Sequence, residues 1–99
     1  MRPLNRSSFT IQKITLPVLA ESINLPYMEI PNGFAAVIRA HPDNTGLVYI
    51  ANSSENTIDP LKRSTLRAND VIQLHIINTN LVYAAGSIEG QTVELIAET

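Results

Sequence analysis

The stretch HPDNTG, residues 41–46, brings together side chains that could do chemistry. His41 and Asp43 are metal-ligand types, and the Asp-Asn-x-Gly spacing resembles a fragment of a calcium-binding loop. The remaining acids of such a loop are missing. The same residue types are sufficient to form a turn, because proline fixes φ, Asp and Asn bond their own backbone, and Gly46 supplies positive φ. The runs AVIRA and LVYIA on either side have matching lengths. We therefore predict a hairpin with no metal site.

Other catalytic arrangements are poorly supported. His75 lies inside the apolar run VIQLHII and is expected to be a sheet residue. Ser53, Ser54 and Glu55 are adjacent, but no Gly-x-Ser-x-Gly elbow surrounds them. Acidic residues are scattered singly, and no phosphate-binding glycine loop is present. We predict that the protein is not an enzyme, has no catalytic residue and needs no cofactor.

The composition is that of one small globular domain. The chain has 99 residues, of which 44% are hydrophobic and only 16% are charged. The usual charged fraction is about a quarter, so part of the surface is expected to lie against a partner. No cysteine is present, which excludes disulfides and thiolate ligands.

Charge is unevenly distributed along the chain. Residues 1–20 carry three bases and no acid, and the remainder carries four bases and nine acids. The net charge of −2 argues against a nucleic-acid binder. The local cluster of Lys62, Arg63 and Arg67 fits either a contact with an acidic partner or a solvated loop. No apolar run approaches the ~20 residues that span a bilayer, so no membrane association is expected.

Short apolar runs separated by turn residues dominate the pattern. Strands are expected over residues 7–16, 18–25, 27–30, 34–40, 47–52, 70–77, 81–86 and 92–98. A slip between Ile11 and Ile14 is compatible with a bulge. In residues 70–77, Ile72, Leu74 and Ile76 share one face. Residues 53–65 read as a polar loop with at most one helical turn, and residues 78–80 as a tight turn.

These elements predict an all-β protein. We expect a small antiparallel β-sandwich or jelly-roll of about seven or eight strands, with an extended N-terminal arm. Residues 1–16 are assigned to the arm or first strand and residues 17–99 to a single sandwich domain. Within the arm, Arg2, Leu4, Arg6 and Phe9 are candidate partner contacts, together with Lys62, Arg63 and Arg67.

From residue 32 onward the chain resembles a group of small tailed-phage virion proteins. The resemblance lies in NGFAAVIRAHPDNTGLVYIANSS, followed by a polar loop and LRANDVIQLHIINTNLVYAAGSIEGQTVELIAE. The matching pieces are an Asn-Thr-Gly turn, a Val-Tyr-Ile strand and a later Leu-x-Tyr-x-x-Gly strand. Related chains tend to carry Pro-Gly where this one has the turn RAND.

The resemblance implies a structural role in the virion. The expected function is a capsid decoration, or cement, protein that binds the major capsid protein on the outer face of the head, as a homo-oligomer with a trimer favoured. Its expected location is the capsid surface, after assembly in the host cytoplasm. Two alternatives stay open: a tail, neck or baseplate component, and a sugar-binding module for adsorption.

Overall fold

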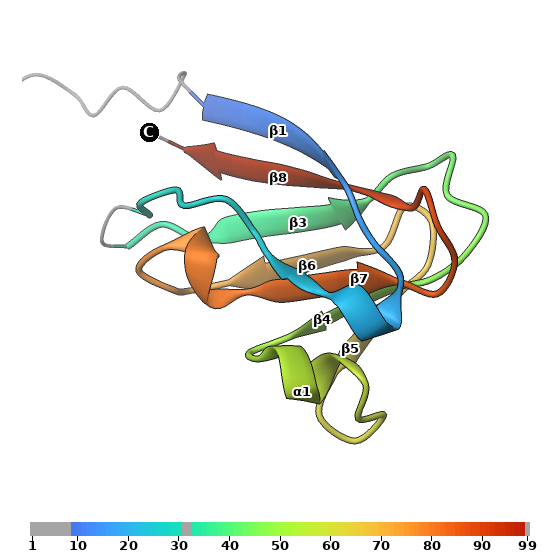
Figure 1. The fold of residues 1–99 in the computed structure, drawn as a ribbon. Coiled ribbons are helices and arrows are strands. Elements are labelled where there is room, and N and C mark those ends of the chain that lie inside the picture. The colour runs from blue at the N-terminus through green and yellow to red at the C-terminus, as the bar shows by residue number, and fades with distance from the viewer. Residues whose placement is uncertain (1–8, 31–32, 99) are drawn as a thin grey trace, which may run out of the picture.

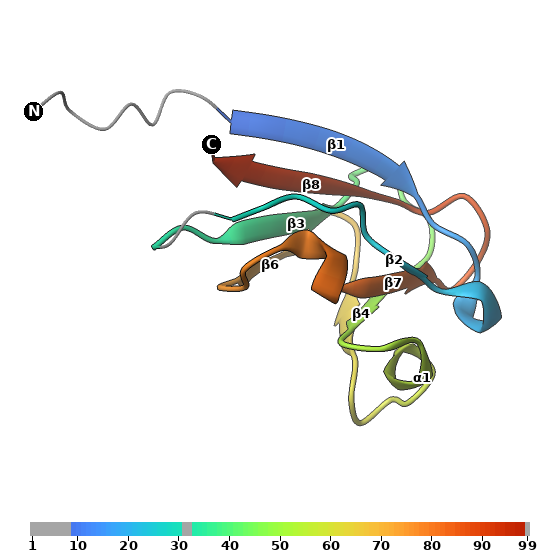
Figure 2. The same ribbon diagram turned by 60° about the vertical axis from the view of Figure 1, so that its left-hand side comes forward.

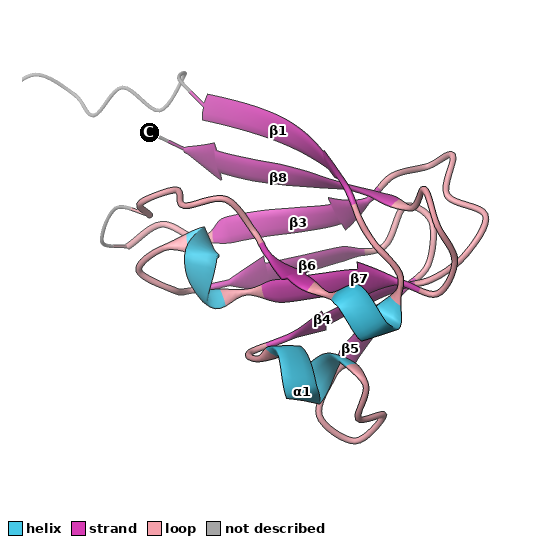
Figure 3. Ribbon diagram, viewed as in Figure 1, coloured by secondary structure: helices cyan, strands magenta, loops and turns pink. Residues whose placement is uncertain are grey.

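The computed structural model describes residues 9–30 and 33–98 (Figure 1). This part of the chain forms eight β-strands in two four-stranded antiparallel sheets. The two layers are separated in the turned view of Figure 2, and Figure 3 shows that helical segments are few and short. The predicted small all-β sandwich is therefore confirmed.

The two sheets have related strand orders. Sheet A has the order β1-β8-β3-β6, and sheet B has the order β2-β7-β4-β5. The strands of sheet A are β1 (Phe9–Thr15), β8 (Thr92–Glu98), β3 (Ala36–Ala40) and β6 (Val71–Leu74). Those of sheet B are β2 (Ile23–Asn24), β7 (Tyr83–Gly86), β4 (Val48–Ala51) and β5 (Ser64–Leu66).

The pairings follow a nested pattern. Strand β1 pairs with β8, β2 with β7, β3 with β6 and β4 with β5. Together these four pairs form one long two-stranded ribbon. Along the ribbon, the strand pairs belong alternately to sheet A and sheet B. Two further pairings, β3 with β8 and β4 with β7, join the turns of the rolled ribbon. Eight strands arranged in this way form a jelly-roll.

The core lies between the facing sides of the two sheets. Ile38, Leu95 and Val48 are fully buried there, together with Leu16 and Leu25 from the segments that lead into and out of β2. Burying each such side chain contributes roughly 1.5–3 kcal/mol.

Strand β6 shows how burial of one face produces a period of two. Ile72 and Leu74 pack against the core, as does Ile76 just beyond the strand, whereas Val71 and Gln73 are exposed. The predicted division of this segment into two faces is confirmed.

The predicted hairpin at residues 41–46 is wrong. Residues 41–47 run from β3 in sheet A to β4 in sheet B, so the two strands do not pair with each other. Strand β3 lies between β8 and β6, and β4 lies between β7 and β5. Matching strand lengths and good turn chemistry do not determine which strand is the partner.

Several expected element boundaries also differ. Pairing of β1 with β8 is continuous from Phe9 to Thr15, so the slip is not a bulge. Phe9 and Ile11 instead lie on one face of the sheet and Ile14 on the core face. The N-terminal candidate contacts Arg2, Leu4 and Arg6 lie outside the described residues, and residues 9–15 of the predicted arm or first strand form β1.

Four other segments can be compared with the predicted strand, loop and turn assignments. The strand expected over residues 18–25 is a 3-10 turn (Leu19–Glu21) followed by the two-residue β2. The strand expected over residues 27–30 supplies one bridge, from Glu29 to Asn78. Residues 53–65 contain the short helix α1 (Ser54–Thr57), and their last two residues begin β5. The tight turn expected at residues 78–80 is a 3-10 turn (Thr79–Leu81).

Candidate functional site

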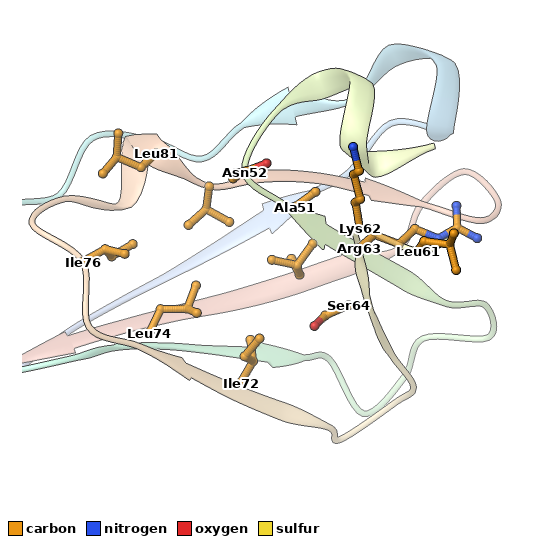
Figure 4. A pocket seen from close by; sticks show the side chains of 12 residues that line it. Ala51, Asn52, Leu61, Lys62, Arg63, Ser64, Ile72, Leu74, Ile76 and Leu81 are labelled. Atoms are coloured by element: carbon orange, nitrogen blue, oxygen red, sulfur yellow. The ribbon is translucent and has the colours of Figure 1, made fainter. Parts of the chain in front are cut away.

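An apolar groove opens where the two sheets end side by side. Strand β5 is an edge of sheet B and β6 an edge of sheet A, and residues 67–70 connect them. This turn is fixed to β3, because Asn69 N donates to Ala40 O and Ala40 N donates to Asp70 O, both at 2.9 Å. Asn69 adopts a left-handed φ of 73°. The two edge strands meet at the turn and leave a groove between them (Figure 4).

The groove has a volume of about 660 Å³, in the usual range for binding sites. Its lining includes buried residues of sheet B. It also includes the half-buried residues on the core face of β6 and of the segment that follows β6. The lining residues are Ile50, Ala51, Asn52, Leu61, Lys62, Arg63, Ser64, Ile72, Leu74, Ile76, Leu81 and Val82. The surface it offers is mainly aliphatic, with polar groups at one end.

The rim of the groove carries exposed leucines. Leu61 is 93% exposed and Leu81 is 49% exposed. A single exposed leucine is ordinary, but these two leucines lie at opposite ends of the groove and extend its aliphatic lining towards solvent (Figure 4). An apolar surface of this kind is typical of protein contact sites. The sequence analysis did not single out either residue. Leu61 lies between a proline and a lysine in a polar loop. A large apolar residue in such a loop is the feature of the sequence that could have indicated a contact residue.

The three predicted basic contacts have different surroundings. The Arg63 guanidinium lies 3.8 Å from the centroid of the Tyr49 ring, and its Nη1 donates to Thr57 O at 3.0 Å. Arg63 therefore covers the outer side of sheet B. The Lys62 amine has no ion pair or hydrogen bond to any described residue. Arg67 lies in the turn beyond the groove and does not line it.

Phe9, the fourth described candidate, is far from these residues in the fold. It begins β1, at the edge of sheet A opposite β6, and it is 59% exposed. The structure thus brings Lys62 and Arg63 to the groove and separates Phe9 from it.

The 41–47 loop is held by residues that were not predicted to interact. Asn44 Nδ2 donates to Thr92 O, and Thr92 N donates to Asn44 Oδ1, both at 2.8 Å. Gly46 N donates to the side chain of buried Gln91 at 2.8 Å, so this loop is fastened to the start of β8. His41 Nδ1 accepts a hydrogen bond from Asp43 N at 3.1 Å and lies 3.9 Å from Asp43 Oδ2, so both contacts of this side chain stay within the loop. Among the described residues, no three His, Asp or Glu side chains gather as a metal site.

A second unpredicted pair crosses sheet A. Arg39 on β3 lies opposite Glu94 on β8, and the Nε of Arg39 donates to Glu94 Oε1 at 2.5 Å. The Glu94 side chain is only 10% exposed, whereas that of Arg39 is 38% exposed. The largely buried carboxylate is therefore paired with Arg39 across the two strands. Both residues occupy ordinary strand positions in the sequence, so only the register reveals the pair.

A smaller hollow lies at one end of the sandwich. It is lined by Tyr27, Glu29, Ile30, Ile77 and Asn78. Tyr27 is 66% exposed and Ile77 is 74% exposed. An aromatic ring beside an acid and an amide is the combination that a sugar-binding site would use, so this hollow is the site relevant to that alternative.

Comparison with known proteins found no matching family model, no similar curated protein and no similar solved structure. Among the described residues, no helix is long and apolar enough to span a bilayer.

Proposed function

We propose that this protein is a structural component of a tailed-phage particle, a capsid decoration protein that binds the major capsid protein and stabilises the head. The observation that carries the proposal is the aliphatic groove between β5 and β6, with Leu61 93% exposed at its rim. The sequence resemblance from residue 32 onward supports the choice of a virion partner. The jelly-roll fold is compatible with this role, although the same architecture occurs in lectins and cupins.

The groove suits a short apolar segment of a partner protein. Such a segment would contact Ile72 and Leu74 along one wall and Leu61 at the rim. Burying the Leu61 side chain would contribute roughly 1.5–3 kcal/mol. The Lys62 amine has no ion pair to a residue that the structure describes, so it favours an acidic residue beside that segment. A modest contact suffices, because a lattice offers many copies of the same site and binding favours the assembled shell.

The test is co-sedimentation of the purified protein with expanded phage heads that lack it. We expect saturable binding at a copy number fixed by the symmetry of the lattice. In the same assay, Leu61→Ser should weaken binding roughly tenfold, the equivalent of about 1.4 kcal/mol. Ile88→Ser is the matched control, because Ile88 is 50% exposed but does not line the groove. Leu61→Ser should unfold at the same denaturant concentration as the parent protein, and Ile88→Ser should stay folded under the conditions of the assay.

The alternative assignments give different results in this experiment. Absence from heads together with recovery in purified tails would move the protein to the tail, neck or baseplate. Absence from both, with polysaccharide binding that Tyr27→Ala abolishes, would identify a sugar-binding module that uses the end hollow. Head binding unaffected by Leu61→Ser would show that the groove is not the contact surface.

A further inference from the structure

Strand β1 differs from the other edge strands of the described sheets. It has seven residues, whereas β6 has four, β5 has three and β2 has two. Natural proteins commonly protect sheet edges by keeping them short or by placing charges and prolines on them. β1 has no proline and one charged residue, Lys13. It is the outermost strand in both Figure 1 and Figure 2, with no described strand on its free side.

The register shows which backbone groups of β1 are unpaired within the sheet. Leu16 N donates to Gln91 O at 2.7 Å, which places this pair among the hydrogen-bonded positions of the β1–β8 ladder. Such positions alternate in antiparallel sheets, so Thr10, Gln12 and Ile14 also face β8 with their amide and carbonyl groups. The backbone groups of Phe9, Ile11, Lys13 and Thr15 point to the free side.

The side chains of the same residues lie on the outer face of sheet A. Ile11 is opposite Ile96 on β8, and Ile96 is opposite Val37 on β3. Ile11 is 50% exposed. An apolar row therefore crosses three strands and ends at the free edge, where it is available for continuation by another strand.

We propose that two copies of this protein pair through antiparallel β1 strands, with the two-fold axis at Ile11. The two sheets A then join into one continuous sheet. The proposal goes beyond the assignment to the virion and does not depend on it. A second copy is the fitting occupant because the strand is self-complementary in this register: Ile11 meets the partner subunit's Ile11, and Thr10 meets the partner subunit's Gln12.

Charge selects this register over its neighbours. Pairing centred on Ile11 sets each Lys13 against the partner subunit's Phe9, where the lysine can lie over an aromatic ring. Pairing centred on Lys13 would place two lysines directly opposite, and pairing centred on Gln12 would make them diagonal neighbours about 7–8 Å apart. A two-fold contact also makes a dimer. A trimer would need β1 to pair with one of the short edges instead.

Cysteine cross-linking tests the register directly, because the parent chain contains no cysteine. Ile11→Cys places the two thiols on either side of the two-fold axis, at a Cα separation of about 5.5 Å that a disulfide can span. We expect it to form a covalent dimer under mild oxidation. Val71→Cys is the control, since Val71 is 55% exposed on the opposite edge, and it should stay a monomer on denaturing gels. Equal cross-linking of the two variants, or none for Ile11→Cys, would overturn the proposal.

The mass of the protein in solution gives a second test that does not depend on an introduced thiol. The parent protein should have the mass of two chains by light scattering, and Ile11→Pro should have the mass of one. The Ile11 amide points away from β8, so proline should remove bonds to the partner copy and leave the β1–β8 ladder in place. The variant should therefore keep a cooperative unfolding transition. A parent mass of one chain or of three chains would contradict two-fold pairing.

Discussion

At the scale of single residues, the predicted role of Gly46 as a positive-φ turn glycine is wrong. The sequence points to Gly46 because turns use glycine at positive φ, but the positive-φ glycines are Gly33 and Gly90. A Cβ at Gly46 would instead lie 2.6 Å from Ser87 Oγ and 2.9 Å from Ile88 Cγ1. Sequence can reveal that a glycine lies in a turn. It does not show which distant residue packs against it.

We expect Gly46→Val to lower the free energy of unfolding by about 1–3 kcal/mol, as overpacking typically does. Ser87 cannot withdraw without loss, because its Oγ accepts a hydrogen bond from Leu47 N at 2.9 Å. His41→Ala should change the free energy of unfolding by less than about 0.5 kcal/mol, since the His41 side chain makes no hydrogen bond to a described residue outside its own loop. Urea denaturation of both variants gives the comparison. Equal losses would show that His41 has a structural role that the loop geometry does not explain.

At the scale of elements, the most predictable segments are those with one buried face. Ile72, Leu74 and Ile76 alternate with exposed residues because β6 has core on one side and solvent on the other. The partners of the 41–47 loop leave no such signal. The Asn44 side chain bonds to the backbone of Thr92 as a neighbouring strand would. Such bonds between residues far apart in the sequence produce no periodic pattern of apolar residues, so the sequence does not reveal them. The loop was correctly recognised as a turn, but its partner was not.

Asn44→Ala should destabilise the fold by about 1–3 kcal/mol, because it leaves the amide of half-buried Thr92 without its hydrogen bond, whereas the Thr92 carbonyl keeps its bond from His41 N. The neighbouring Thr45→Ala is the matched control, since Thr45 is exposed and has no hydrogen bond to a described residue. Thermal and chemical unfolding of the two variants would measure the difference. A loss confined to Thr45→Ala would mean that the loop is held from its other side.

At the scale of the whole molecule, the two candidate contact surfaces lie at opposite edges. Strand β1 ends sheet A on one side, and β6, which forms a wall of the groove, ends it on the other. The pattern of short apolar runs and frequent turns correctly indicates an all-β fold, because it leaves few other options. The order of the strands is set by pairings between distant segments, and short β runs of similar composition do not specify them.

This separation predicts that the two contacts can be removed independently. Ile11→Pro should abolish the dimer and keep the groove, so each chain should retain its affinity for phage heads when binding is measured per site at low occupancy. Leu61→Ser should weaken head binding and leave the dimer mass unchanged. Light scattering and co-sedimentation of the double variant should show both losses and no further one. A dimer lost in Leu61→Ser would place the self-contact at the groove.

The nested pairing also determines when the chain can fold during synthesis. Strands β7 and β8 follow the other six in sequence, yet each is an interior strand, β8 between β1 and β3 and β7 between β2 and β4. A nascent chain therefore cannot complete sheet B until β7 has left the ribosomal exit tunnel, or sheet A until β8 has left it. Until then β1 has no neighbour and the apolar faces of β3 and β4 stay open, which makes a slow, late and cooperative folding step the expected behaviour.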